Sequence, residues 1–177
     1  MIGKVWMEPR SSAAGSRSLQ LLECFLSWGW TVSFATTAGE SPYKADLTSL
    51  GVAEYNITVN DAGFDVFVKQ LDPDTVIFDR FSTEEQFGWR VAAQCPNALR
   101  VLDTIDLHCL RTARHTALKE NRDFTKQDLF NDTAKREVAA IYRCDLSLMI
   151  STVEMDLLEN YFKVDKPLLH YVPFMPE

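Results

Sequence analysis

The densest group of reactive side chains in the sequence lies between positions 103 and 115. Its members are two carboxylates, two histidines and two arginines: Asp103, Asp106, His108, Arg111, Arg114 and His115. A carboxylate two residues from an imidazole can serve as a general base or hold a sugar hydroxyl, so Asp106 and His108 are the candidate catalytic residues. Asp103 and Arg111 are candidate substrate-binding residues beside them. If a helix begins near Leu107, His108 and Arg111 share one stripe of it. The alternative is that Asp106 only caps an exposed helix.

A second candidate region is the loop from Glu8 to Arg17, which is rich in small residues. Small residues let a backbone approach a ligand closely, and the N-terminus of the helix that follows favours an anion. The loop matches neither the GxGxxG nor the P-loop pattern. Because of the small residues and the helix N-terminus, we still expect phosphate or sugar binding here, with a plain surface turn as the alternative. The candidate binding residues are Arg10, Ser12, Gly15 and Arg17.

Two other polar pairs follow apolar segments. Asp79 and Arg80 come directly after the run Val76 to Phe78, and they either face a ligand or simply solvate a strand end. Ser151 and Glu154 open a predicted helix as an S-x-x-E pattern, for which a capping box is the alternative interpretation.

The elements that position these residues alternate along the chain. Apolar patterns predict strands at 5–7, 30–36, 53–59, 75–78, 99–102, 146–150 and 168–172. Amphipathic patterns predict helices at 18–28, 61–71, from Thr83, from Leu107, at 132–143 and at 152–162. Such alternation is typical of an α/β fold: a doubly wound, mainly parallel sheet with helices on both faces, as in Rossmann-like domains. In such a sheet, ligands bind at the carboxyl ends of the strands.

Composition limits the other classes of function. The formal net charge of −7 argues against nucleic-acid and anionic-membrane partners. No apolar run reaches the length of a membrane span and the first residues do not form a signal peptide, so the cytoplasm is the expected compartment. The four cysteines form no CxxC pair, and we expect no metal site and no cofactor. Cys24 and Cys144 are expected to be reduced core residues.

Taken together, these segments resemble the N-terminal domain of retaining glycosyltransferases of the GT-B fold, the group-1 or family-4-like set. The segments that carry the resemblance are the loop 9–17, PDTVIFDR, LDTIDLHCLRTAR, RCDLSLMISTVEMDLL and the closing HYVPFMPE. The closing segment is similar to the one that leaves this domain for the second domain. The resemblance covers nearly the whole chain, which we interpret as a single domain, residues 1–177.

The resemblance implies a division of labour. The N-terminal domain of such enzymes holds mainly the acceptor, the C-terminal domain binds the nucleotide-sugar, and catalysis occurs between them. It implies that Arg10 and Gly15 face the donor phosphates and the acceptor. It also implies that Asp106 and His108 correspond to the family's D-x-H, and Ser151 and Glu154 to its S-x-x-E. The chain departs from the family pattern at Ile105, where many relatives carry a histidine, and in having one glycine in the first loop.

The sequence contains no counterpart of the second domain or of its E-x7-E glutamates. We therefore interpret it as the acceptor-side half of a glycosyltransferase, inactive alone, whose nucleotide-sugar donor is bound through a C-terminal domain that this sequence does not contain. The acceptor is not identified. The alternative is a stand-alone Rossmann-like module that binds a small molecule or a partner. Exposure of Tyr171, Phe174 and Met175 at the end of the domain is further expected to favour self-association into a homo-oligomer.

Overall fold

Seven parallel strands form a single sheet in the computed structural model, which describes residues 1–175. The strands run in the order β3-β2-β1-β4-β5-β6-β7, and every neighbouring pair is parallel. Their bounds are β1 Ile2–Gly3, β2 Ser33–Thr36, β3 Ala53–Asn56, β4 Thr75–Asp79, β5 Leu99–Asp103, β6 Leu146–Met149 and β7 Leu169–Tyr171. The predicted doubly wound, Rossmann-like α/β fold is confirmed.

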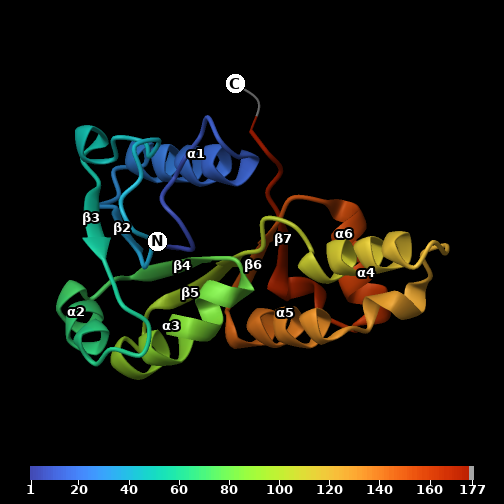
Figure 1. Ribbon diagram of the computed structural model, residues 1–177. Coiled ribbons are helices and arrows are strands. Elements are labelled where there is room, and N and C mark those ends of the chain that lie inside the picture. Colours follow the sequence, from blue (N-terminus) through green and yellow to red (C-terminus); the bar gives the residue numbers. More distant parts are fainter. Residues whose placement is uncertain (176–177) are drawn as a thin grey trace.

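Residues 1–175 form six α-helices, of which α1 lies on one face of the sheet and α2, α3 and α5 lie on the other (Figure 1). Leu21 of α1 packs on Ile77 and Val101, whereas Phe64 of α2 belongs to the core cluster that contains Phe78. The bounds of the helices are α1 Ala13–Ser27, α2 Gly63–Leu71, α3 Phe81–Gln94, α4 His108–Lys119, α5 Asp132–Arg143 and α6 Thr152–Tyr161. Three short 3-10 helices are η1 Thr48–Leu50, η2 Lys126–Leu129 and η3 Lys166–Leu168.

The direction of strand succession changes between β1 and β4. From β1 the chain moves outward to β2 and β3, and then returns to place β4 on the other side of β1. Such a change of direction opens a crevice at the carboxyl ends of the strands. Lys4, directly after β1, donates its backbone N–H to the Asp79 carboxylate at 3.1 Å, so the two strand ends meet there.

The prediction of a first strand at 5–7 is wrong, because β1 is Ile2–Gly3. Trp6 and Met7 are apolar for a different reason: they are buried in a loop that packs against Phe34 of β2. The ammonium group of Lys44 covers the Trp6 ring at 4.1 Å. A short apolar run alone does not distinguish a short strand from a loop that buries its side chains.

Two helix starts also differ from the prediction. The first helix begins at Ala13 rather than at Ser18, because the Ser12 hydroxyl accepts a hydrogen bond from the Gly15 amide and caps it. On this helix Leu22 is buried, whereas Leu19 and Leu26 are only partly buried. The third helix begins at Phe81, which places the buried Thr83 inside it rather than at its cap.

Within residues 1–175, no helix is both long and apolar enough to cross a membrane.

Candidate functional site

The N-terminus of α4 is held by carboxylates from two other helices. Glu154 of α6 accepts a hydrogen bond from the Leu107 amide at 3.2 Å. Glu137 of α5 accepts bonds from the amides of His108 and Cys109, both at 2.7 Å. A helix N-terminus carries free amides and partial positive charge, which carboxylates satisfy. The interpretation that Asp106 caps this helix is therefore wrong.

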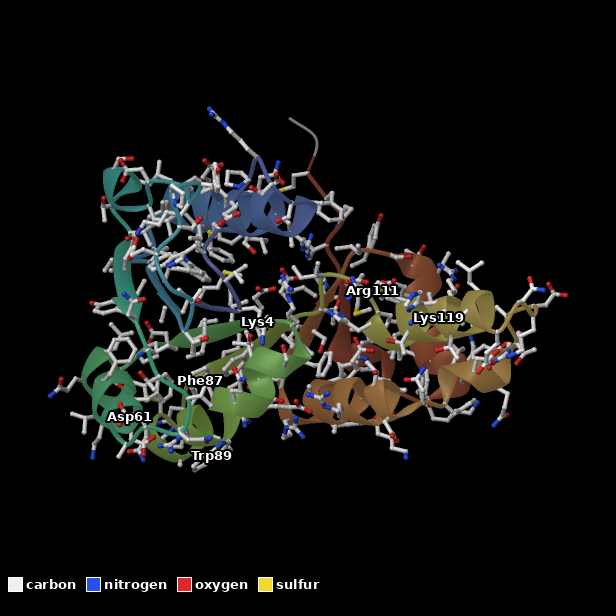
Figure 2. All side chains as sticks on the ribbon, in the orientation of Figure 1. Lys4, Asp61, Phe87, Trp89, Arg111 and Lys119 are labelled. Carbon is white, nitrogen blue, oxygen red and sulfur yellow. The ribbon has the colours of Figure 1, made fainter. Side chains whose placement is uncertain are left out.

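Because the α4 amides are already bound, the Asp106 carboxylate is directed to side chains. One oxygen lies 3.2 Å from the guanidinium of Arg111, and the other lies 3.7 Å from the His108 ring nitrogen Nδ1. The Asp106 side chain keeps 28 % of its surface exposed. Figure 2 labels Arg111 near the start of α4. The predicted grouping of Asp106, His108 and Arg111 is thus present in the fold.

His108 is held from three directions. Its Nδ1 lies 3.0 Å from the backbone oxygen of Asp106 and 3.3 Å from Glu137 Oε1, and its ring meets Phe81 edge-on at 5.3 Å. Burial disfavours the charged imidazole, but the hydrogen bond to Glu137 and the charges of Asp106 and Glu137 outweigh burial, so the pKa of His108 is raised.

Glu154 departs from the capping-box arrangement. Ser151 caps α6 by accepting a hydrogen bond from the Glu154 amide at 3.4 Å. The Glu154 carboxylate, however, reaches Leu107 rather than the cap of its own helix, and its second oxygen is buried with no partner among residues 1–175. Burial raises the pKa of Glu154, and the charges of Asp106 and Glu137 act in the same direction. The S-x-x-E pattern thus joins α6 to α4.

Glu137 is the site residue that the sequence reading missed. Only 4 % of it is exposed, and its neighbours one turn away, Ala134, Ala140 and Ile141, are buried as well. The available signal was a carboxylate on the apolar stripe of an amphipathic helix. Such a residue needs buried donors as partners, and the α4 amides supply them.

Two residues beside the site hold a backbone conformation that side chains disfavour. Arg80, between β4 and α3, has φ of 67°, and Ile105, between β5 and α4, has φ of 62°. For a β-branched residue such as isoleucine this conformation is strained, and such strain gathers at functional sites. The Arg80 amide binds the Asp103 carbonyl oxygen at 2.8 Å, so the two strand ends are tied together.

Asp79 and Arg80 lie at the predicted edge of the sheet. The Asp79 carboxylate is almost fully buried, and it accepts hydrogen bonds from the Lys4 amide at 3.1 Å and from Arg80 Nε at 3.0 Å. The Arg80 side chain remains 25 % exposed. Lys4, labelled in Figure 2, comes from the loop after β1. Arg80 is therefore available at the crevice, while Asp79 orients the groups around it.

The first loop folds mainly onto itself. Gly15 packs so closely on Glu8 that an added Cβ atom would lie 2.5 Å from the Glu8 carbonyl oxygen. The Ser12 hydroxyl caps α1, and Arg10 is exposed. A small hollow at the crevice is lined by Ser12, Gly15, Asp79 and Arg80, among others. Of the four residues predicted in this loop, Arg10 is the exposed cation.

Arg17 and Asp103 are fully buried and bind each other, with Arg17 Nη2 3.0 Å from Asp103 Oδ1. Arg17 also donates to the backbone oxygens of Val172 and Pro173 at 2.7 and 3.1 Å. These two predicted binding residues thus join α1, β5 and the segment after β7.

Cys109 directly follows His108 in α4. Burial raises the pKa of the Cys109 thiol, which opposes a role as nucleophile. Of the two cysteines expected in the core, Cys144 is buried and Cys24 only partly so. Across residues 1–175, no three histidine, cysteine or carboxylate side chains are grouped so as to hold a metal ion.

No protein-family model matches the chain, and a search of curated proteins finds no match in sequence.

Proposed function

We propose that the chain is the acceptor-binding, N-terminal domain of a glycosyltransferase that moves a sugar from a nucleotide-sugar to an acceptor. One observation carries the proposal: the D-x-H segment and the S-x-x-E segment, far apart in sequence, are joined by the 3.2 Å hydrogen bond between the Leu107 amide and Glu154. These are two of the segments on which the resemblance to GT-B enzymes rests.

The chemistry of the cluster suits a hydroxyl-rich acceptor. Asp106 offers a partly exposed carboxylate that can accept a hydroxyl proton in a hydrogen bond. His108, 17 % exposed, and Arg111, 62 % exposed, place donors beside it. All three follow β5, at the carboxyl edge where parallel sheets bind ligands.

In this proposal the nucleotide-sugar is held mainly by a second domain, and transfer occurs between the two. Asp106 and His108 touch the acceptor, and the cations Arg10 and Arg80 contact donor phosphates. A cytoplasmic location belongs to the same proposal.

The test is a ligand titration of the isotopically labelled chain, followed by amide chemical shifts. The probes are a panel of mono- and disaccharides, with a nucleotide-sugar as a separate arm. We expect a saccharide to move the amides of Leu107 and His108, and Asp106→Asn to weaken its binding at least tenfold without a change in melting temperature. The matched control is Asp123→Asn, at an exposed position beyond α4.

Equal saccharide binding by the Asp106 variant and the wild type would count against the proposal. Ligand-induced shifts confined to the first loop, with a nucleotide as the best ligand, would favour the stand-alone small-molecule module instead.

A further inference from the structure

A cavity of about 500 Å³ lies within the layer of the sheet, between β2 and β4. Two of its walls are strand backbone, residues 31–33 leading into β2 and residues 74–76 leading into β4. The other two walls are helix side chains, which are Leu22 and Phe25 from α1 and Phe64, Phe67, Val68 and Leu71 from α2. Figure 1 shows the N-terminus of the chain lying near β2 and β4.

The register of β1 identifies this space. Ile2 lies opposite Ala35 on one side and Phe78 on the other. Stepping back along the parallel register, Met1 lies between Phe34 and Ile77. The next three places on the amino side of Met1 oppose residues 33, 32 and 31 of one wall and residues 76, 75 and 74 of the other. These six residues line the cavity, so it follows the upstream path of β1.

The backbone of Met1 already bonds as the interior of a strand does. Its nitrogen donates to the Ser33 carbonyl oxygen at 2.7 Å, and its carbonyl oxygen accepts from the Ala35 amide at 2.9 Å. This pair is the ladder pattern of parallel strands.

The pairing of the two walls leaves further backbone groups aimed into the cavity. Val32 and Asp74 direct their carbonyl oxygens away from it, to the amides of Ala53 and Leu99. Because successive residues of a strand direct their backbone groups to opposite neighbours, the Ser33 amide and the Thr75 carbonyl oxygen point toward the cavity, whereas the Ser33 carbonyl oxygen is already bound by Met1.

The ammonium group at Met1 is poorly suited to its surroundings. Met1 is only partly buried, but desolvation of its amino group lowers the pKa of that group to about 5, so the charged form is disfavoured. A buried charge is disfavoured unless it is well paired, whereas a peptide N–H at the same position would donate the same bond to Ser33 without a charge to desolvate.

We propose that the cavity is the seat of a short extended segment, about three residues long, that continues β1 on the amino side of Met1 in the same polypeptide. The first of these residues lies on the side of α2, because Ile2 belongs to the core cluster of Phe64 and Val68. The next lies on the side of α1, because Met1 packs in the cluster that contains Leu22. A strand buried on both faces is apolar throughout, so the segment is apolar at every place.

Covalent continuity distinguishes this occupant from a strand supplied by another chain. A foreign strand in this register would end against the Met1 amino group and cover it without forming a peptide bond to it. A continuous strand turns the ammonium into an amide and keeps the 2.7 Å bond to Ser33.

The experiment compares the 177-residue chain with two extended forms. One carries Val-Leu-Val before Met1, and the matched control carries Gly-Ser-Asp; a third sample is the N-acetylated chain, which loses the charge but does not fill the space. We expect Val-Leu-Val to raise the melting temperature by about 4 °C or more. We also expect it to slow hydrogen exchange of the Ser33 and Ile77 amides about tenfold, with little effect from the other two.

Equal exchange at Ser33 and Ile77 in the Val-Leu-Val and Gly-Ser-Asp forms would overturn the proposal. Protection of the same amides in the unextended chain that grows with protein concentration would also overturn it, because a second copy would then be the occupant. The intact mass of the protein from its native cells should exceed that of the 177-residue chain. A native protein beginning at Met1 would contradict the assignment of the occupant.

Discussion

The guanidinium of Arg17 and the carboxylate of Asp103 form a fully buried ion pair, 3.0 Å apart, which links the helix after β1 to the end of β5. The same guanidinium binds the backbone oxygens of Val172 and Pro173, where the chain leaves the sheet. The positions of α1, of the β5 end and of the C-terminal segment therefore depend on one side chain.

Arg17→Leu should lower the free energy of unfolding by about 3–5 kcal/mol, because it leaves the Asp103 carboxylate buried and unpaired. The measurement is urea denaturation followed by circular dichroism. Lys119→Leu, at an exposed position labelled in Figure 2, is the control and should change stability by no more than about 0.5 kcal/mol.

The double variant Arg17→Leu with Asp103→Leu makes the test specific. It should recover part of the lost stability, because no charge then remains unpaired. If the double variant were less stable than Arg17→Leu alone, the Asp103 side chain would stabilise the fold even without Arg17, and the charge-pairing argument would be wrong.

Gly15→Ala should destabilise the chain by about 1–3 kcal/mol, because the new methyl group would be forced against the Glu8 backbone at 2.5 Å. Gly39→Ala is the matched control, since no atom lies within 4 Å of its added Cβ. Thermal unfolding of both variants provides the comparison. Equal melting temperatures would mean that the first loop can move away from α1.

The sheet could be predicted from the sequence because its strands carry strong local signals. Val76 to Phe78 is apolar on both faces, and a helical pattern follows it, as it follows the strand patterns at 53–59, 99–102 and 146–150. The first strand was misplaced because only two residues pair there, and the buried Trp6 and Met7 imitate a strand while packing in a loop.

The candidate site was predicted in part. Asp106, His108 and Arg111 are local in sequence, so their grouping followed from helical spacing. The contributions of Glu137 and Glu154 depend on how α5 and α6 pack against α4, which spacing does not encode. Arg17 and Asp103 were predicted to contact a ligand, but they bind each other. Neither local segment indicates this pairing, because the two residues lie far apart in the sequence.

Stability attributable to His108 should decrease as the pH rises. Its pKa in the folded chain is raised above 6.5, so the folded state binds this proton more tightly than the unfolded state does. The stabilisation is fully present below pH 6.5 and is lost as the pH rises through the folded pKa. The difference in unfolding free energy between wild type and His108→Gln should therefore be larger at about pH 6 than at about pH 8. A difference that grows with pH would contradict the assignment.

The chain should self-associate through its C-terminal segment, but more weakly than if Tyr171, Phe174 and Met175 were all exposed. Tyr171 and Phe174 are exposed, but the expectation for Met175 was wrong: its sulfur lies 3.7 Å from the Cys24 sulfur, and its carbonyl oxygen accepts a bond from Gln20. We expect concentration-dependent light scattering that is reduced in a Tyr171→Ser, Phe174→Ser double variant. A wild-type chain that stays monomeric at every concentration would contradict the prediction.

Sugar transfer by the isolated chain should be undetectable, because the proposed function assigns most donor contacts to a second domain. The assay incubates the purified chain with nucleotide-sugars and the best saccharide from the titration, and follows release of the nucleotide. Turnover that persists through purification and is lost in Asp106→Asn would show that this domain catalyses transfer by itself. Turnover that is unchanged in Asp106→Asn would indicate a contaminating enzyme.

Glu137→Ala should lower the free energy of unfolding by about 3–6 kcal/mol, since one buried carboxylate accepts the amides of both His108 and Cys109 and hydrogen bonds to charged groups contribute about 1.5–3 kcal/mol each. Glu137→Gln keeps one acceptor oxygen and the shape of the side chain, so its loss should be smaller. Glu137→Gln should also lower the pKa of His108, because the hydrogen bond and charge of Glu137 raise that pKa in the wild type. Carbon-detected titration of the histidine rings measures this shift, and the exposed Glu23→Gln provides the control. If Glu137→Gln left the His108 titration unchanged, Glu137 would only cap α4. The assignment of the raised His108 pKa to Glu137 would then be wrong.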